Sequence, residues 1–172
     1  MKHLMPKVAR ATMLAISILM MTTGQAFAQS ALQKQVIGTW TLASNTIAQA
    51  DGGKYLPFGA NPQGILIFDA AGRYSLQICR TTDRLKFVSN NREKGTPEEN
   101  AAAIRGCNPH WGTYTVNDSD RTITFNIQHG LFPNWEGLQQ KRTFTLTGDE
   151  LKYVVPAASA GGTAEVVWRR AK

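Results

Sequence analysis

Apolar and polar residues alternate with a period of two along most of the chain after residue 36, and this pattern constrains the fold more than any other feature. Successive side chains of a strand point to opposite faces, so the pattern is typical of strands with one buried face. Short segments rich in Gly, Asp and Asn separate the alternating runs and predict turns. The predicted strands are Val36–Ala48, Gly64–Asp69, Arg73–Arg80, Gly112–Asn117, Thr122–Gln128, Lys141–Thr147, Leu151–Val155 and Thr163–Arg170.

Seven or eight strands joined by short turns predict an all-β fold, either an antiparallel barrel or a sandwich. The exception is Thr96–Arg105, where an N-cap residue, a proline at the first helical position and two acids precede Ala101-Ala102-Ala103-Ile104. This order of residues predicts one short helix that ends at Gly106. With 42% hydrophobic and 18% charged residues, the chain is not of the disordered type, and it shows no internal repeat or second domain.

Residues 1–28 have the pattern of a secretory signal peptide. Three basic residues precede the apolar run Ala11–Met21, and Ala26-Phe27-Ala28 offers a cleavage site of the small-x-small type. The apolar run is about half as long as the roughly 20 residues that span a bilayer, so we expect no membrane span. The predicted mature domain is therefore 29–172, exported to the periplasm or secreted.

The net charge gives little support for nucleic-acid binding. The whole chain carries +7, but three basic residues and no acid lie in 1–28, so the remaining residues carry only +4. No stripe of basic residues with interleaved aromatics occurs, and we expect no nucleic-acid partner.

Cys79 and Cys107 are the two cysteines of the chain. In an oxidising compartment a disulfide is the default for such a pair. Their spacing and the lack of further ligands disfavour a redox or metal pair of the CxxC kind. A bridge between them would hold the predicted helix against the strands.

Several short motifs resemble a known family. Gly38-Thr39-Trp40 resembles the G-x-W signature of lipocalins, and four further stretches in the same order resemble the bacterial lipocalin-like domain family. The resemblance covers nearly all of residues 36–170 and implies a small up-and-down β-barrel of about eight strands, but it implies little about chemistry. The four stretches are Asp51-Gly52-Gly53, Pro57–Gly64, Leu131–Gly137 and Val166–Arg170.

The resemblance also implies a structural pair. In lipocalins the tryptophan of the signature closes one end of the barrel, and an arginine near the last strand packs over it. Trp40 takes the first role by its motif, and Arg169 or Arg170 takes the second. The contact would be a cation–π interaction.

Strand parity predicts which side chains point into the barrel. In each predicted strand the apolar residues at every second position form the inner face. Continuing that alternation to the strand ends places three basic residues on the same face: His110 before Tyr114, through Gly112, His129 after Ile127, and Arg142 before Phe144. An apolar interior with cationic donors at its rim suits an amphiphile with an acidic head group. Alternatively, all three lie at strand ends in solvent, and Arg142 pairs with Glu136.

Two aromatic residues complete the candidate ligand-binding set. Trp135 lies in a loop between Pro133 and Gly137, where an exposed aromatic often serves binding. It can equally plug one end of the barrel together with Phe132. Tyr114 belongs to the predicted interior face and is the second aromatic candidate.

Catalytic and cofactor motifs are sparse. The sequence contains no nucleophile elbow, zinc helix, phosphate loop or dinucleotide fingerprint, and we expect no cofactor or metal. The remaining enzyme hypothesis is acid–base chemistry by His110 or His129 with Tyr114 or Glu136, as in an isomerase, cyclase or hydratase acting on a hydrophobic substrate.

Three hypotheses therefore stand. The leading one is an exported, non-enzymatic barrel that binds a small apolar or amphiphilic molecule. The second is the enzyme just described. The third is an envelope protein that works by protein contact, such as an inhibitor. The sequence leaves the oligomeric state open.

Overall fold

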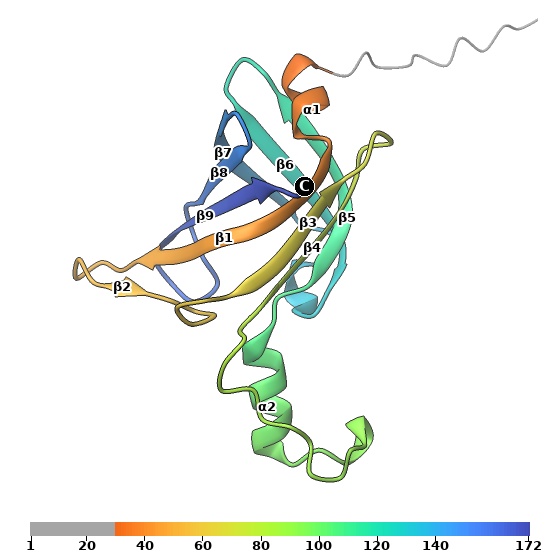
Figure 1. Ribbon diagram of the computed structural model, residues 1–172, viewed down its shortest axis with the longest axis vertical. Helices are drawn as coiled ribbons and strands as arrows, with labels where there is room; N and C mark the ends of the chain where they lie inside the picture. The colour runs from red at the N-terminus through yellow and green to blue at the C-terminus, as the bar shows by residue number, and fades with distance from the viewer. Residues whose placement is uncertain (1–29) are drawn as a thin grey trace, which may run out of the picture.

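The computed structural model describes residues 30–172, so the export signal predicted at 1–28 lies outside the described residues. Eight antiparallel strands form a closed barrel, because β1 pairs with β3 on one side and with the last strand, β9, on the other (Figure 1). The all-β lipocalin-like barrel predicted from the sequence is confirmed. The barrel strands are β1 (Gly38–Ala48), β3 (Gln63–Phe68), β4 (Arg73–Cys79), β5 (His110–Asn117), β6 (Thr122–Gly130), β7 (Gln139–Thr147), β8 (Glu150–Val155) and β9 (Thr163–Arg170).

The remaining elements are short. The two-residue strand β2 (Lys54–Tyr55) extends the end of β1 as a hairpin. Two α-helices, α1 (Ala31–Val36) and α2 (Pro97–Gly106), and two 3₁₀ turns, η1 (Arg92–Lys94) and η2 (Pro133–Trp135), lie outside the barrel wall. In Figure 1, α1 lies at one end of the barrel and α2 projects beyond the other. No helix in residues 30–172 is long and apolar enough to cross a membrane.

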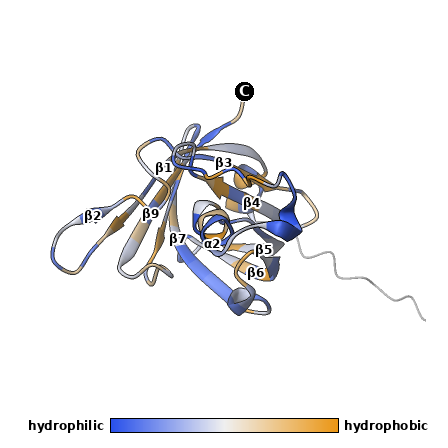
Figure 2. Cartoon of the chain, turned by 90° about the horizontal axis from the view of Figure 1, so that it is seen from below, coloured by the Kyte–Doolittle hydropathy of each residue, from blue (hydrophilic) through white to orange (hydrophobic). Residues whose placement is uncertain are grey.

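The interior is the face that strand parity predicts. Buried side chains alternate with exposed ones along β4, β6, β8 and β9, as expected for strands with one solvated face. In contrast, β7 is largely hydrophilic (Figure 2) and buries only Phe144 fully. The largest side chains of the core are aromatic, including Trp40, Phe68, Tyr114, Phe144 and Trp168.

Trp40 closes the end of the barrel next to α1, which we call the closed end. Its ring is fully buried, and its indole N–H donates a hydrogen bond to the Val36 carbonyl at 2.8 Å. The Arg170 guanidinium carbon lies 4.2 Å from the ring centroid, and the same group donates to the Ile37 carbonyl. Of the two arginines considered for this contact, Arg170 is the one over the ring, whereas Arg169 is exposed. Arg170 shares the inward parity of Trp168, and Arg169 does not.

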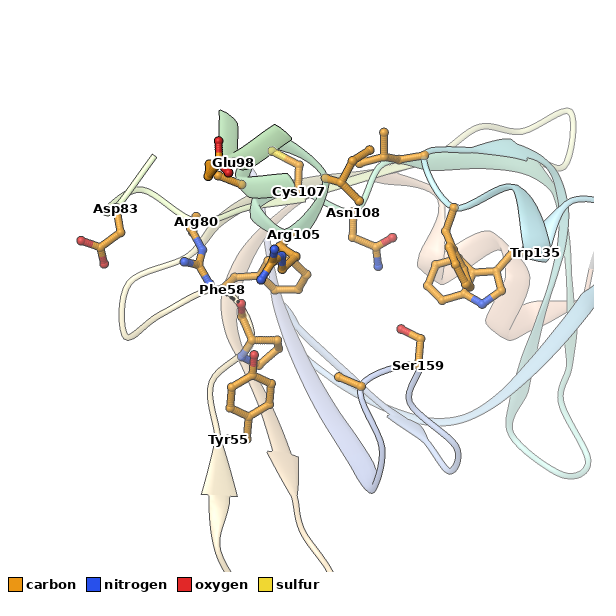
Figure 3. A pocket seen from close by; sticks show the side chains of 16 residues that line it. Tyr55, Phe58, Arg80, Asp83, Glu98, Arg105, Cys107, Asn108, Trp135 and Ser159 are labelled. Atoms are coloured by element: carbon orange, nitrogen blue, oxygen red, sulfur yellow. Dashed lines mark hydrogen bonds between the residues drawn. The ribbon is translucent and has the colours of Figure 1, made fainter. Parts of the chain in front are cut away.

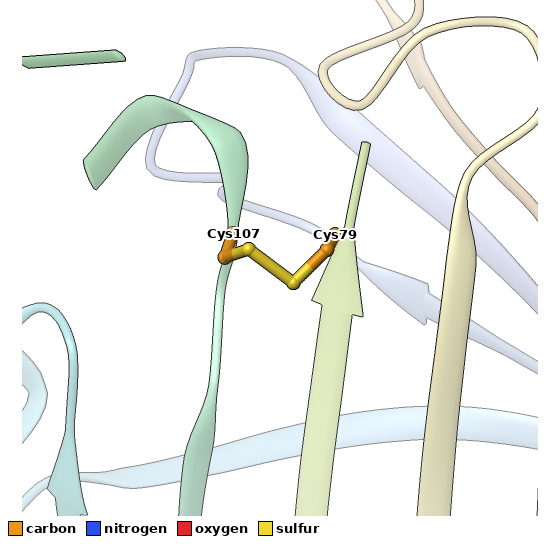
Figure 4. The surroundings of a disulfide bond; sticks show 2 residues. All are labelled: Cys79 and Cys107. Carbon is orange, nitrogen blue, oxygen red and sulfur yellow. A yellow bond between two sulfur atoms is a disulfide. The ribbon is translucent and has the colours of Figure 1, made fainter. Parts of the chain in front are cut away.

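A disulfide joins Cys79, the last residue of β4, to Cys107, directly after α2 (Figure 4). Backbone hydrogen bonds flank it on both sides, from Arg80 N–H to the Gly106 carbonyl and from Asn108 N–H to the Ile78 carbonyl. The capping box between Thr96 and Glu99 starts α2 where the sequence predicts a helix. The segment between Cys79 and Cys107, which contains α2, is thus anchored at both of its termini to the barrel. The anchor lies at the open end of the barrel, opposite Trp40.

A bulge interrupts the pairing of β5 and β6. Trp111 pairs with His129 and Gly112 pairs with Ile127, so Gln128 is the extra residue. Gly112 allows this close approach, because a Cβ there would lie 2.0 Å from the Asn126 carbonyl oxygen. The β6 backbone fills the space that a side chain at position 112 would need. Beyond the bulge, the side chains of β6 change face.

Candidate functional site

The open end of the barrel contains an inner chamber of about 150 Å³. Its walls are mostly apolar and come from β1, β4, β6, β8 and β9, with Ile47, Ile78, Phe125, Val155 and Val166 among them. A cavity of this size accommodates a single benzene ring. The chamber is therefore large enough for one aromatic ring and too small for a bulky ligand to enter completely.

Arg142 supplies the positive charge of this chamber. Among residues 30–172 no carboxylate lies within 4.0 Å of its guanidinium, and the acceptors of its hydrogen bonds are neutral: the Gln140 side-chain oxygen and the Lys141 carbonyl. Burial lowers the pKa of Arg142, while the nearby Tyr153 and Tyr74 hydroxyls favour its charged form. A guanidinium has five N–H donors, so this one retains donors for a further acceptor.

The predicted partner of Arg142 is bound elsewhere. Glu136 lies outside the barrel, where its Oε1 is 3.3 Å from His129 Nδ1. The internal Arg142–Glu136 pair expected as an alternative is absent, because the loop after β6 turns Glu136 toward the outer wall. The positive charge in the chamber thus has no acidic partner within the described chain.

His110 and Tyr74 form a buried polar pair beside Arg142. The Tyr74 hydroxyl lies 2.8 Å from His110 Nδ1, and the imidazole is only 8% exposed. Burial, and secondarily the charge of Arg142, lowers the pKa of His110 to about 4. Burial raises the pKa of Tyr74 above its ordinary value and that of Tyr153 to about 12. At neutral pH these three groups are therefore uncharged.

Asn45 adds a second polar group with an unmet requirement. It is nearly buried in the chamber wall on β1, and its side-chain oxygen has no hydrogen-bond partner within the described residues. Buried polar atoms without partners are rare in native proteins and often mark a place where a ligand or water binds.

Aromatic rings line the path from the chamber to the surface. Phe125 lies at its inner part, with ring centroids 4.8 Å from Tyr74 and 5.9 Å from Tyr153. Trp135 lies nearer the surface, edge to face with His110 at 5.7 Å. These edge-to-face contacts are a favourable geometry between aromatic rings.

Outside the chamber lies an open vestibule of about 690 Å³, bounded by α2, the loop after β2, η2 and the loop before β9 (Figure 3). Arg80 and Arg105 line it together with Asp83 and Glu98, so positive and negative charges balance. Figure 3 shows Trp135 across this space from Phe58 and the two arginines. The vestibule and the chamber share the lining residues Pro57, Phe58, Asn108, Trp135, Ser159 and Ala160, which form the mouth between them.

The structure brings together three of the five predicted ligand-binding residues: Arg142, His110 and Trp135. His129 lies on the outer wall beside Trp111, with ring centroids 5.3 Å apart, because the bulge at Gln128 reverses its parity. Tyr114 is buried toward the closed end, where its hydroxyl donates to the Asp69 carbonyl at 2.9 Å. Neither residue lines the chamber.

Several lining residues were not among the predicted set. Parity places Tyr153 in the interior but does not distinguish a chamber wall from packed core. Phe58, Asn108 and Ala160 lie on loops, where no periodic signal exists.

Of the acid–base pairs in the enzyme hypothesis, His129 and Glu136 lie 3.3 Å apart, but on the outer wall of the barrel. His110 faces the chamber, so the two histidines do not converge on one pocket. No group of three His, Cys, Asp or Glu side chains within residues 30–172 is placed to bind a metal ion.

The low pKa of His110 predicts a loss of stability in mild acid. An unfolded histidine binds its proton near pH 6.5, whereas folded His110 does so only near pH 4. Between pH 7 and 5 the unfolded state therefore binds more protons, and the free energy of unfolding falls by about 2 kcal/mol. Urea denaturation of the wild type and of His110→Gln measures this, and the fall should nearly vanish in the variant. His129→Gln, which removes an exposed histidine, is the control and should show the same fall as the wild type. An equal fall in the wild type and in His110→Gln would contradict a buried, neutral His110.

Together, the closed antiparallel barrel, the Trp40–Arg170 closure and the chamber at the opposite end define a lipocalin-like protein. The lipocalin-like domain family matches residues 37–171, and the chain belongs to that family.

A curated relative, the 4'-hydroxy-3'-methoxypropiophenone carrier protein ppsC of Aspergillus oryzae, is 33% identical over 86 residues. The match covers 44% of this chain and 78% of the relative. Among solved structures, a point mutant of the fluorescent protein UnaG is 11% identical, with 80% of this chain and 97% of that chain covered. Its TM-score of 0.36 is too low to inform function.

Proposed function

We propose that this protein is a non-enzymatic carrier that binds a small, one-ring amphiphile in the inner chamber of the barrel. The observation that carries the proposal is the Arg142 guanidinium, which lines a mostly apolar chamber without a carboxylate partner in the described chain. Arg142 is half-buried, and partial removal of a charge from water without a counterion is unfavourable, so a polar ligand group that accepts its hydrogen bonds stabilises the site.

The size and lining of the chamber support an aromatic ligand. About 150 Å³ suits one ring, which Phe125 and Trp135 can contact edge to face. The unpartnered side-chain oxygen of Asn45 offers an acceptor for a donor group on the same ligand. Substituents longer than the chamber extend through the mouth into the vestibule.

The relative from Aspergillus oryzae is named as a carrier of 4'-hydroxy-3'-methoxypropiophenone. That molecule has one aromatic ring, a ketone, a phenol and a methoxy group, which is the kind of amphiphile that the chamber favours. We propose hydroxylated aryl ketones as the first ligands to test.

Calorimetric titration with 4'-hydroxy-3'-methoxypropiophenone tests the proposal. We expect one ligand per chain and at least about tenfold weaker binding to Ala160→Trp, because the added indole blocks the mouth shared by chamber and vestibule. Ala71→Trp is the matched control, since it adds the same side chain at an exposed turn at the closed end. Absence of binding, or equal weakening by both variants, would refute a chamber site.

We also propose that residues 1–28 direct export and are removed. Support comes from the basic, apolar and small-x-small order of these residues and from a disulfide in the folded domain, which oxidising compartments favour. Intact-mass measurement of the exported protein should give a chain that begins at Gln29, and a cell-retained chain that begins at Met1 would oppose it.

A further inference from the structure

The lining of the inner chamber has an unusual charge balance. Among residues 30–172 its titratable lining members are His110, Arg142 and Tyr153, and none of the described lining residues is Asp, Glu or Lys. The strands around Arg142 present only groups that are neutral at pH 7: Tyr74 from β4, His110 from β5 and Tyr153 from β8, with Gln140 on its own strand β7. The chamber therefore carries a net charge of +1 within an apolar wall.

This balance decides which protonation state of a ligand is preferred. An apolar chamber by itself penalises an anion, as it penalises any charge. Here, however, the half-buried Arg142 cation is already part of the folded protein, and its neutral acceptors do not compensate its charge. An anion placed against the guanidinium restores charge neutrality through strong, charge-assisted hydrogen bonds, which a neutral ligand cannot do.

We infer that the chamber selects the anionic form of a weakly acidic one-ring ligand, so that a phenol binds as its phenolate with the oxygen against Arg142. The inference rests on the proposed function and extends it by naming the ionisation state and the ligand class. It also predicts that binding acidifies the ligand, because a site that prefers the anion lowers the ligand's own pKa by thermodynamic linkage.

The chamber is well suited to an optical test of this shift. Between about pH 6 and 9 its histidine is neutral, with a pKa of about 4, and its tyrosines stay protonated. A change in the ligand spectrum over that range therefore reports the ligand. 4-Hydroxyacetophenone is a suitable probe, since its phenolate absorbs at longer wavelength than its phenol, and 4-methoxyacetophenone is the matched probe that cannot ionise.

We expect the phenolate to bind at least about tenfold more tightly than the phenol, which corresponds to a fall of about one unit in the pKa of the bound probe. At pH 9 4-hydroxyacetophenone should also bind more tightly than its methyl ether by a similar factor. In Arg142→Met the pKa of the bound probe should return to that of the free probe or rise above it. Arg169→Met removes an exposed arginine and should leave the shift unchanged.

The possible outcomes separate the two proposals. If both probes bind but the pKa of the phenol is unchanged or raised, the selection of anions is wrong and the carrier function stands. An equal fall of the pKa in wild type and Arg142→Met would also overturn the inference, since the guanidinium would not be its cause. If neither probe binds, both proposals fail. Should Arg142→Met not fold, Arg142→Gln provides the same comparison.

Discussion

Replacing Trp40 with alanine should lower the free energy of unfolding by about 3–5 kcal/mol, among the largest losses that a single substitution produces. The ring is fully buried at the closed end, donates a hydrogen bond to Val36 and lies under the Arg170 guanidinium. Truncation leaves a cavity, an unpaired Val36 carbonyl and an arginine without its ring. Urea or guanidinium denaturation measures the loss.

Trp111→Ala is the matched control, because it removes the same atoms from a side chain that is 49% exposed on the outer wall. We expect its effect to stay within about 0.5 kcal/mol, as for most surface substitutions. A loss below about 1 kcal/mol for Trp40→Ala would mean that its ring does not close the barrel.

The second large effect is expected from the disulfide. The double variant Cys79→Ala/Cys107→Ala should be less stable than the oxidised wild type by about 3–4 kcal/mol, because a bridge across 28 residues restricts the unfolded chain. Thiol titration of the denatured, unreduced wild type should find no free cysteine. A reductant should lower the stability of the wild type to that of the variant and leave the variant unchanged.

Two reactive thiols in the unreduced wild type would contradict the bridge. A stability that is equal with and without reductant would show instead that the flanking backbone hydrogen bonds of Arg80 and Asn108 are sufficient to hold the segment that contains α2.

Strand periodicity predicted an antiparallel barrel or sandwich, the family resemblance selected the barrel, and strand parity predicted part of the chamber lining. Arg142 and His110 each follow the inward parity of a neighbouring apolar set, and both line the chamber. The same reasoning misplaces His129, because a bulge depends on how two strands pair and leaves no trace in the alternation of either. Parity from Trp168 would have selected Arg170 rather than Arg169 for the contact with Trp40.

Features without a period could not be predicted in this way. The helix α1 has six residues, too few for a helical repeat to be recognised, although Ser30 caps it by accepting a hydrogen bond from Gln33 N–H. The mouth residues Phe58, Asn108 and Ala160 come from three separate loops. These three residues lie close together only because the barrel is closed, so no local sequence pattern predicts the mouth.

The seam between β1 and β9 has a consequence for how the chain folds. Trp40 pairs with Arg170 there, and the Arg170 guanidinium reaches back 133 residues to the Ile37 carbonyl. Contacts so distant in sequence carry a large loop-closure cost and are characteristic of slow-folding topologies. Neighbouring hairpins can form early, but the curved sheet keeps two unpaired edges until its last strand is available. The barrel is closed only when β9 is paired with both β1 and β8, so the interior stays accessible to water and the chamber incomplete until both pairings have formed.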